Sequence, residues 1–163
     1  MSLVLIHGFT GGPSSFDELF SHLDVPTSSL RPTLLGHHRD RDPKRESQSF
    51  VEEVDRLGEE LRAGAPHTLV GYSLGGRVAA GLVARFPHLW SSAILVGAHP
   101  GLEEAELDAR EALDRAIAER LGHDIDAFVD YWASLPIFAG QKERNPTGYA
   151  AQDTLRRSHR PNA

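Results

Sequence analysis

The sequence of 163 residues contains no cysteine. This absence excludes disulfide bonds, thiolate metal ligands and a cysteine nucleophile, so any covalent or base chemistry must come from other side chains. The lack of cysteine does not by itself identify the cellular compartment.

A basic excess and a long apolar run are missing as well. The formal net charge is −6 and no long run of lysine and arginine occurs, whereas a nucleic-acid partner needs a basic face. No stretch approaches the ~18–20 apolar residues of a membrane span, and the N-terminus lacks a charged region followed by an apolar one. We therefore expect a cytoplasmic protein of one domain with neither nucleic acid nor membrane as partner. The oligomeric state stays open.

A glycine-flanked serine dominates what is present. The segment Gly71-Tyr72-Ser73-Leu74-Gly75 lies between an apolar run at 68–70 and a small-residue stretch at 76–86. This order predicts strand, sharp turn and helix, with a strained serine whose neighbouring glycines let the two elements pass. The bare G-x-S-x-G pattern also occurs in ordinary glycine-rich loops. The strand before it and the helix after it favour a nucleophile elbow with Ser73 as the nucleophile.

Two backbone N–H groups are candidates for an oxyanion hole. The N–H of Leu74 is left unpaired at the start of the elbow helix. The apolar run 3–6 predicts a buried strand, and the glycine-rich loop at 7–13 follows it. In the α/β-hydrolase architecture the loop after such a strand supplies the second donor, which here is the N–H of Phe9.

Strand and helix patterns alternate along the first half of the chain. Besides the elements above, we expect a helix over 16–23 capped by Ser14 or Ser15, a strand at 28–35 that Pro32 keeps at an edge or ends early, and a buried strand at 92–97. The capping-box pattern at 49–52 starts a further helix, and the charged run 39–46 is expected to be a solvated loop. This alternation predicts an α/β fold with a doubly wound, mostly parallel sheet.

The character of the sequence changes after residue 98. A long charged helix is expected over 103–121 and a shorter aromatic helix over 125–134, where hydrolases insert a cap. We therefore divide the chain into a core at 1–98 and a helical cap at 99–163. The second part also holds the start of an unfinished C-terminal segment, polar and arginine-rich from 145 onward.

Two arginines have two interpretations each. Arg110 falls in the apolar stripe of its helix, where it either pairs with Asp114 at i,i+4 or points down at an anionic substrate. Arg77, in the first turn of the elbow helix, either binds the same anion or is simply exposed at the surface.

The sequence resembles the 2-succinyl-6-hydroxy-2,4-cyclohexadiene-1-carboxylate synthases, lyases of menaquinone synthesis with the α/β-hydrolase fold. The matching segments cover most of the chain and lie at 7–11, 70–77, 99–102, 110–114, 128–132 and 135–139. The run Gly-Tyr-Ser-Leu-Gly-Gly-Arg is more specific than a generic elbow.

The resemblance implies a lyase that eliminates pyruvate from 2-succinyl-5-enolpyruvyl-6-hydroxy-3-cyclohexene-1-carboxylate without a metal or organic cofactor. Ser73, activated by a histidine, would abstract the substrate proton, and the N–H groups of Phe9 and Leu74 would hold the developing oxyanion. A small substrate with several carboxylates suits convergent arginines. The substrate-binding side chains implied by the resemblance are Tyr72, Arg77, Arg110 and Trp132.

Two departures accompany this resemblance. His38 stands where relatives usually carry glycine. More important, the triad of this fold runs Ser, then Asp or Glu, then His on loops after late strands, and no apolar strand pattern follows Val96. The four histidines after the serine are expected to be surface or capping residues: His88, His99, His123 and His159.

A single α/β-hydrolase domain needs ~200–250 residues. We therefore expect the triad acid and histidine to lie beyond this chain, an exposed unpaired strand, and no useful turnover by these residues alone. Three interpretations stay open: the lyase, a general ester or thioester hydrolase with the same elbow, and a non-catalytic fragment or binding remnant.

Overall fold

The computed structural model describes residues 2–24, 29–37, 49–99 and 101–159. Three parallel strands form its sheet in the order β1-β2-β3: Leu3–Ile6, His67–Tyr72 and Trp90–Val96. The register pairs Ile6 of β1 with Gly71 of β2, and Gly71 with Leu95 of β3. The loops that follow β1 and β2 therefore emerge side by side at the carboxyl edge of the sheet, and the predicted parallel α/β fold is confirmed.

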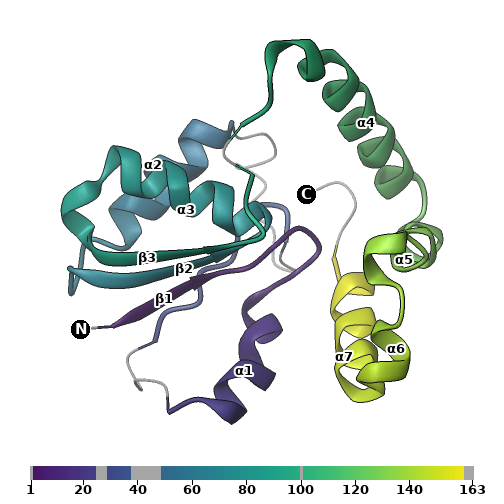
Figure 1. Cartoon of the computed structure of the whole chain (residues 1–163), viewed down its shortest axis with the longest axis horizontal. Helices are drawn as coiled ribbons and strands as arrows, with labels where there is room; N and C mark the ends of the chain where they lie inside the picture. The colour runs from purple at the N-terminus through teal and green to yellow at the C-terminus, as the bar shows by residue number, and fades with distance from the viewer. Residues whose placement is uncertain (1, 25–28, 38–48, 100, 160–163) are drawn as a thin grey trace.

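Helices lie on both sides of this sheet (Figure 1). Helices α2 (Phe50–Glu60) and α3 (Leu74–Arg85) cover one face, and α1 (Asp17–His22) lies on the other side after a short 3₁₀ turn, η1 (Pro13–Phe16). A second 3₁₀ turn, η3 (Pro87–Leu89), connects α3 to β3. The helix α3 ends at Phe86, before Pro87, as the sequence predicts.

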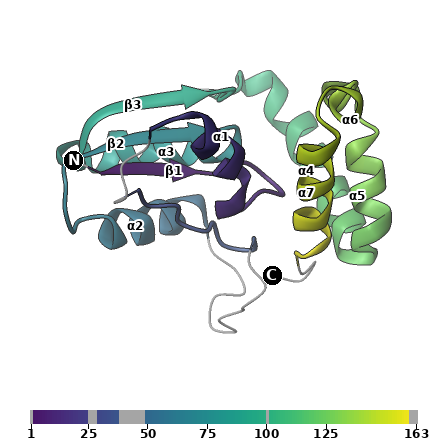
Figure 2. The same cartoon turned by 90° about the horizontal axis from the view of Figure 1, so that it is seen from below.

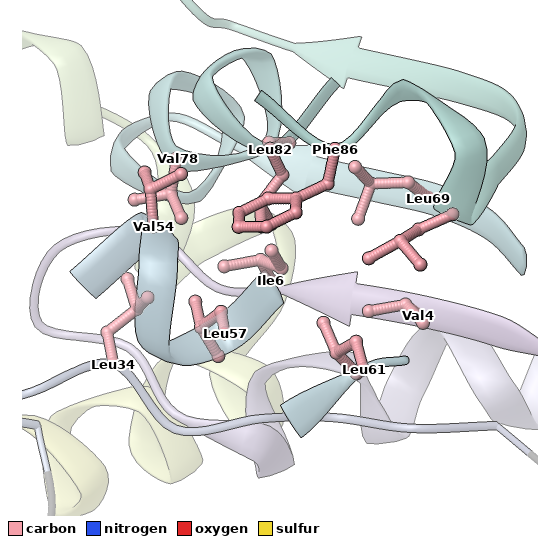
Figure 3. Packing of buried hydrophobic residues seen from close by; sticks show 12 residues of the cluster. Val4, Ile6, Leu34, Val54, Leu57, Leu61, Leu69, Val78, Leu82 and Phe86 are labelled. Atoms are coloured by element: carbon pink, nitrogen blue, oxygen red, sulfur yellow. The ribbon is translucent and has the colours of Figure 1, made fainter. Parts of the chain in front are cut away.

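One apolar cluster fills the space between β1, β2, α2 and α3 (Figure 3). Ile6, Leu57, Leu69 and Leu82 are less than 1% exposed at its centre. The other members are Val4, Leu34, Val54, Leu61, Val78, Ala79, Phe86 and Leu89. The continuous apolar run of β1 and the stripe of α2 meet here, so this cluster is the core that positions the carboxyl edge of the sheet.

The capping box at the start of α2 is confirmed. The Ser49 N–H donates to Glu52 Oε2 at 2.7 Å, and the Glu52 N–H donates to Ser49 Oγ at 3.3 Å. These two bonds satisfy N–H groups that a helix start leaves without partners.

Of two expectations about the first half of the chain, the strand at 28–35 is confirmed only as a short pairing at the sheet edge, and the side-chain cap of α1 was wrong. Within 29–37 only Leu30 pairs with the sheet, as an isolated bridge to Val4, because Pro32 ends the pairing early at this edge. No side chain caps α1, which follows directly on η1; the Ser15 Oγ accepts a bond from the Gly12 N–H at 3.1 Å instead. Residues 25–28 of the expected strand, His38 and the charged run 39–46 lie outside the described residues.

Strand β3 was expected to be buried and is not. Ile94, Leu95 and Val96 are 54%, 46% and 47% exposed, because no described strand pairs with the outer edge of β3. The exposed strand and apolar surface that the sequence predicts are confirmed for the described residues. No described strand follows Val96.

Beyond the carboxyl ends of the strands lies a group of helices, called here the helical layer (Figures 1 and 2). It consists of α4 (Glu104–His123), α5 (Ile125–Ala133), the 3₁₀ turn η4 (Pro136–Phe138), α6 (Gln141–Arg144) and α7 (Pro146–Arg157). The two expected cap helices are confirmed as α4 and α5. Helix α7 lies in the C-terminal segment from residue 145 onward, for which the sequence analysis predicted no helix. The boundary at 98/99 stays a prediction.

Ion pairs hold α5 against α7. The Arg157 guanidinium donates to Asp126 and Asp130 of α5 at 2.9 and 2.5 Å, and to Asp153 of its own helix at 2.9 Å. These carboxylates raise the pKa of Arg157 above its usual value. In the part of the chain that is described, every helix is too short or too polar to cross a bilayer.

Candidate active site

Ser73 occupies the sharp turn between β2 and α3. Its φ and ψ are 53° and −112°, a conformation that is rare for a residue with a side chain. The chain can turn so tightly because a methyl group at Gly75 would lie 2.2 Å from the Ile6 oxygen, and one at Gly71 would lie 2.4 Å from the Gly75 oxygen. The strained serine and its two required glycines confirm the strand-turn-helix geometry of a nucleophile elbow.

The loop after β1 lies directly against this elbow. A methyl group at Gly8 would be 3.0 Å from the Tyr72 ring and 3.3 Å from the Ser73 Cβ. Phe9 follows Gly8, and the Gly11 N–H donates to the Gly8 oxygen at 3.0 Å, which closes a four-residue turn around Phe9 and Thr10. The carboxyl edge of the sheet thus brings the Phe9 backbone beside the serine.

The two expected oxyanion donors are both available. In the first turn of α3, the N–H groups of Gly76 and Arg77 donate to the Ser73 oxygen at 3.0 and 3.1 Å. Within the described ranges, no hydrogen bond occupies the N–H of Leu74 or that of Phe9. Two free N–H groups beside a strained serine can stabilise negative charge that develops on a substrate oxygen.

Aromatic side chains of the helical layer cover the Phe9 ring. The Trp132 ring lies 5.2 Å from it and the Phe128 ring 6.3 Å, both in edge-on geometry. Trp132 also stacks on Phe128 at 5.6 Å and meets Phe138 at 5.9 Å. Trp132 therefore packs against the loop that carries Phe9, and its contact with substrate stays a prediction.

A buried arginine on α7 was missed by the sequence analysis. Arg156 is 4% exposed, and its Nε and Nη1 atoms have no hydrogen-bond partner among the described residues. Its guanidinium lies 5.0 Å above the Phe138 ring. Burial lowers the pKa of Arg156, while Tyr149, Asp153 and Tyr72 act in the opposite direction. The nearby Asp153 carboxylate is hydrogen-bonded to Arg157 instead.

A buried guanidinium without a carboxylate partner is costly, so this position favours an anionic ligand. The sequence does carry a signal for the helix: Asn145 followed by Pro146 is a typical helix start, and the Asn145 side chain accepts from the Gly148 N–H at 2.9 Å. No local signal shows which face of that helix is buried.

The other predicted substrate-binding residues, Tyr72, Arg77 and Arg110, are all at least partly exposed to solvent. The Tyr72 side chain, next to the nucleophile, is 51% exposed. Arg77 is exposed on the first turn of α3. Arg110 donates through Nε to both Asp114 oxygens at 2.9 Å, and its side chain is 41% exposed. The structure therefore shows the i,i+4 pair for Arg110; its contact with substrate stays a prediction, as does that of Arg77.

No histidine or carboxylate of the described residues hydrogen-bonds the Ser73 hydroxyl. His88 and His123 are exposed, and the exposed His99 accepts a bond from the Gly101 N–H at 3.2 Å, as a surface or capping residue does. The expectation for His159 was wrong: it is 8% exposed, because α7 packs its end against His37, with the rings 5.5 Å apart. Within the same residues, no histidine and carboxylate group is arranged to hold a metal ion.

His159 belongs to a cluster of three histidines, and the ring of one of them, His37, lies 5.8 Å from the Phe9 ring. The His7 and His37 rings are 5.1 Å apart. His7 Nδ1 donates to the Gly8 oxygen at 2.9 Å, and its Nε2 accepts from the Leu34 N–H at 3.1 Å. These partners require the neutral ring, and burial lowers the pKa of His7 to about 4. Burial also lowers the pKa of His37.

The fold and the elbow define the class of protein. The sequence pattern of the alpha/beta hydrolase fold family matches residues 2–117. The chain belongs to the α/β-hydrolase family.

Within this family, the chain is similar in sequence to one group of enzymes. The 2-succinyl-6-hydroxy-2,4-cyclohexadiene-1-carboxylate synthase of Citrobacter koseri is 34% identical over 142 residues, covering 84% of this chain and 55% of the relative. A Bacillus subtilis (strain 168) protein that carries this name provisionally is 33% identical over 147 residues, covering 86% of this chain and 53% of the relative. The chain thus spans about half the length of these curated relatives.

Solved structures agree on the fold. The structure of MenH from S. aureus superposes with a TM-score of 0.86 at 28% identity, over 99% of this chain and 62% of that one. The esterase RhEst1 from Rhodococcus sp. ECU1013 superposes with a TM-score of 0.69 at 22% identity, over 99% and 62% of the two chains, and shows the fold alone.

Proposed function

We propose that this chain carries the nucleophile, the oxyanion hole and part of the substrate pocket of a carbon–oxygen lyase that eliminates pyruvate from 2-succinyl-5-enolpyruvyl-6-hydroxy-3-cyclohexene-1-carboxylate. The likeness to the synthases supports the reaction. The observation that carries the proposal is the buried guanidinium of Arg156, whose Nε and Nη1 atoms have no hydrogen-bond partner among the described residues. It lies within electrostatic range of Tyr72, one residue from Ser73. An esterase acting on neutral esters has no use for such a cation, whereas a substrate with several carboxylates does.

The proposed chemistry begins at Ser73. A histidine from outside the described residues takes the hydroxyl proton of Ser73, and the serine oxygen takes a proton from the substrate ring. The electron pair of the broken C–H bond forms a ring double bond, and the bond between the ring carbon and the enolpyruvyl oxygen breaks. The leaving pyruvate enolate takes a proton from the histidinium and becomes pyruvate, which restores the neutral histidine. The N–H groups of Phe9 and Leu74 stabilise the negative charge that develops on the substrate oxygen.

Five further side chains bind the substrate in this proposal. Arg156 binds one carboxylate from the helical layer, and Trp132 and Tyr72 bound the pocket beside the elbow. Arg77 and Arg110 supply the remaining positive charge, which for Arg110 requires that the substrate replace Asp114 as its partner. A small anionic substrate in a cytoplasmic biosynthetic step suits this distribution of charge.

The test measures pyruvate release from this substrate by the protein as its host produces it and, in parallel, by the 163-residue chain. We expect release by the host protein, a loss of about 10³-fold or more in Ser73→Ala, and a raised KM in Arg156→Ala that Arg156→Lys partly restores. The chain alone is expected to show no useful rate, because the described residues supply no base for Ser73. Robust turnover by the chain alone contradicts that part of the proposal.

Two outcomes favour the other interpretations. Hydrolysis of simple esters or thioesters with no pyruvate release favours the hydrolase. Failure of Ser73 in the folded host protein to react with a fluorophosphonate probe favours a non-catalytic binding protein.

A further inference from the structure

Two residues with side chains have a positive φ in the described part of the chain, and only one of them is accounted for by the elbow. Ser73 has φ 53° and Thr10 has φ 60°. They lie in the loops that follow the neighbouring strands β2 and β1, so both strained residues belong to one edge of the sheet. Strained backbone of this kind gathers at functional sites and persists only where the surroundings enforce it.

Thr10 is an unfavourable residue for its position. It is the third residue of the turn that the Gly11 N–H closes onto the Gly8 oxygen at 3.0 Å. A positive φ at the third position of such a turn is normally given to glycine or asparagine, since a β-branched side chain crowds its own backbone there. A glycine at residue 10 would adopt the same turn without strain.

The surroundings of the turn enforce this conformation. The Gly8 oxygen accepts a second bond, from His7 Nδ1 at 2.9 Å, and His7 is in turn held by the Leu34 N–H at 3.1 Å. Thr10 itself is 5% exposed. Its branched side chain is thus confined in a turn that is anchored at both ends, whereas glycine would leave the backbone many more conformations.

We propose that Thr10 is a positioning residue, which rests on the function proposed above: its confined, branched side chain fixes the turn so that the Phe9 N–H is aimed at the substrate oxygen. Phe9 is the second residue of the turn and Thr10 the third. Because the two residues share one short turn, backbone motion at residue 10 also moves the Phe9 N–H, which is the oxyanion donor. An oxyanion hole acts through donors that need no reorganisation during the reaction. The confinement of the Thr10 side chain keeps the donor in place.

The proposal assigns this role to the branched shape of the side chain and not to its hydroxyl. Thr10→Val keeps the shape and removes the hydroxyl, whereas Thr10→Gly removes both and relieves the strain. Because glycine fits the turn, Thr10→Gly is expected to fold with a urea midpoint equal to or above that of the wild type. Loss of activity in this variant then does not come from unfolding.

The test compares these two variants with the wild type in pyruvate release by the host protein. We expect Thr10→Gly to lower kcat about 10- to 100-fold with KM changed less than about threefold, and Thr10→Val to keep kcat within about threefold. Unchanged kcat in Thr10→Gly overturns the proposal. Equal losses of kcat in both variants overturn it as well, because the hydroxyl would then be the active group.

A second measurement does not depend on catalysis. The ¹⁵N order parameter of the Phe9 amide is expected to be near about 0.85 in the wild type and in Thr10→Val, and to fall below about 0.6 in Thr10→Gly. If the wild type releases no pyruvate, the proposed function fails and the amide decides the role of Thr10 by itself. Equal order parameters of the Phe9 amide in all three proteins overturn the positioning role of Thr10.

Discussion

The sheet with α2 and α3 and the helical layer differ in the size of the apolar cluster that each buries. The sheet region buries a continuous apolar cluster whose central members are less than 1% exposed. In the helical layer, α4 has no buried residue, α5 buries Phe128 and Val129, and α7 buries Arg156. The apolar cluster of the first region is expected to supply most of the free energy of unfolding. The second combines a small aromatic cluster with a buried guanidinium, and it contributes Trp132 and Arg156 to the candidate site.

The most severe test of this comparison removes one leucine from each region. Leu57 on α2 is fully buried, and Leu57→Ala is expected to lower the free energy of unfolding by about 3–4 kcal/mol, through lost burial and a cavity. Leu113 on α4 is 51% exposed, and Leu113→Ala is expected to change it by less than about 0.5 kcal/mol. Urea unfolding of both variants provides the measurement. Similar losses for the two leucines would contradict the comparison.

Two glycines, one in each region, provide a second test of the comparison. Gly75→Ala places a methyl group 2.2 Å from the Ile6 oxygen, so we expect a loss of about 3 kcal/mol and a displaced elbow. Gly122→Ala on α4 meets nothing within 4 Å and removes a poor helix former, so a gain of up to about 1 kcal/mol is expected. Thermal unfolding of the two variants should move in opposite directions, and a stable Gly75→Ala protein would refute the packing at the elbow.

The cluster of His7, His37 and His159 predicts a pH dependence of the free energy of unfolding. The pKa of His7 is about 4 in the folded protein, against an ordinary value near 6.5. The unfolded chain therefore binds a proton that the folded chain does not between these pH values, and stability is complete above about 6.5 and falls as the pH drops toward about 4. The slope is about 1.4 kcal/mol per pH unit for each such histidine, or about 2 kcal/mol for His7 between pH 6.5 and 5.

Urea unfolding at pH 7, 6 and 5 measures this slope. His37 contributes in the same direction, since burial lowers its pKa too. His88→Gln, at an exposed position, is the control and should leave the slope unchanged. A stability that is constant down to pH 5 would contradict the neutral, buried His7.

The smallest effect is expected from the ion pairs inside the helical layer. Arg157→Met removes the bonds to Asp126 and Asp130, whose side chains are 69% and 72% exposed. Exposed pairs are screened by water and salt, so a loss of less than about 1 kcal/mol is expected, smaller still in 1 M salt. Urea unfolding at two salt concentrations checks it, and a loss as large as that of Leu57→Ala would mean that charge and not the apolar cluster stabilises the protein.

The sequence by itself determined the features that depend on neighbours along the chain. The apolar run of β1, the capping box at Ser49 and the glycines on both sides of Ser73 act within a few residues, so their patterns predict the strand, the helix and the elbow directly. The place of the Leu74 N–H at the start of the elbow helix followed from the same local order, whereas the place of the Phe9 N–H also depends on the pairing of β1 with β2.

Only the tertiary structure decided which groups are buried and which are paired. The burial of Arg156 and His159 depends on where α7 packs, and the exposure of Ile94 depends on the strand that β3 lacks as a neighbour in the described residues. The pair between Arg110 and Asp114 was one of two arrangements that the sequence allowed. Burial and pairing are set by contacts between elements that are distant in sequence. A local sequence pattern does not show which distant elements come into contact.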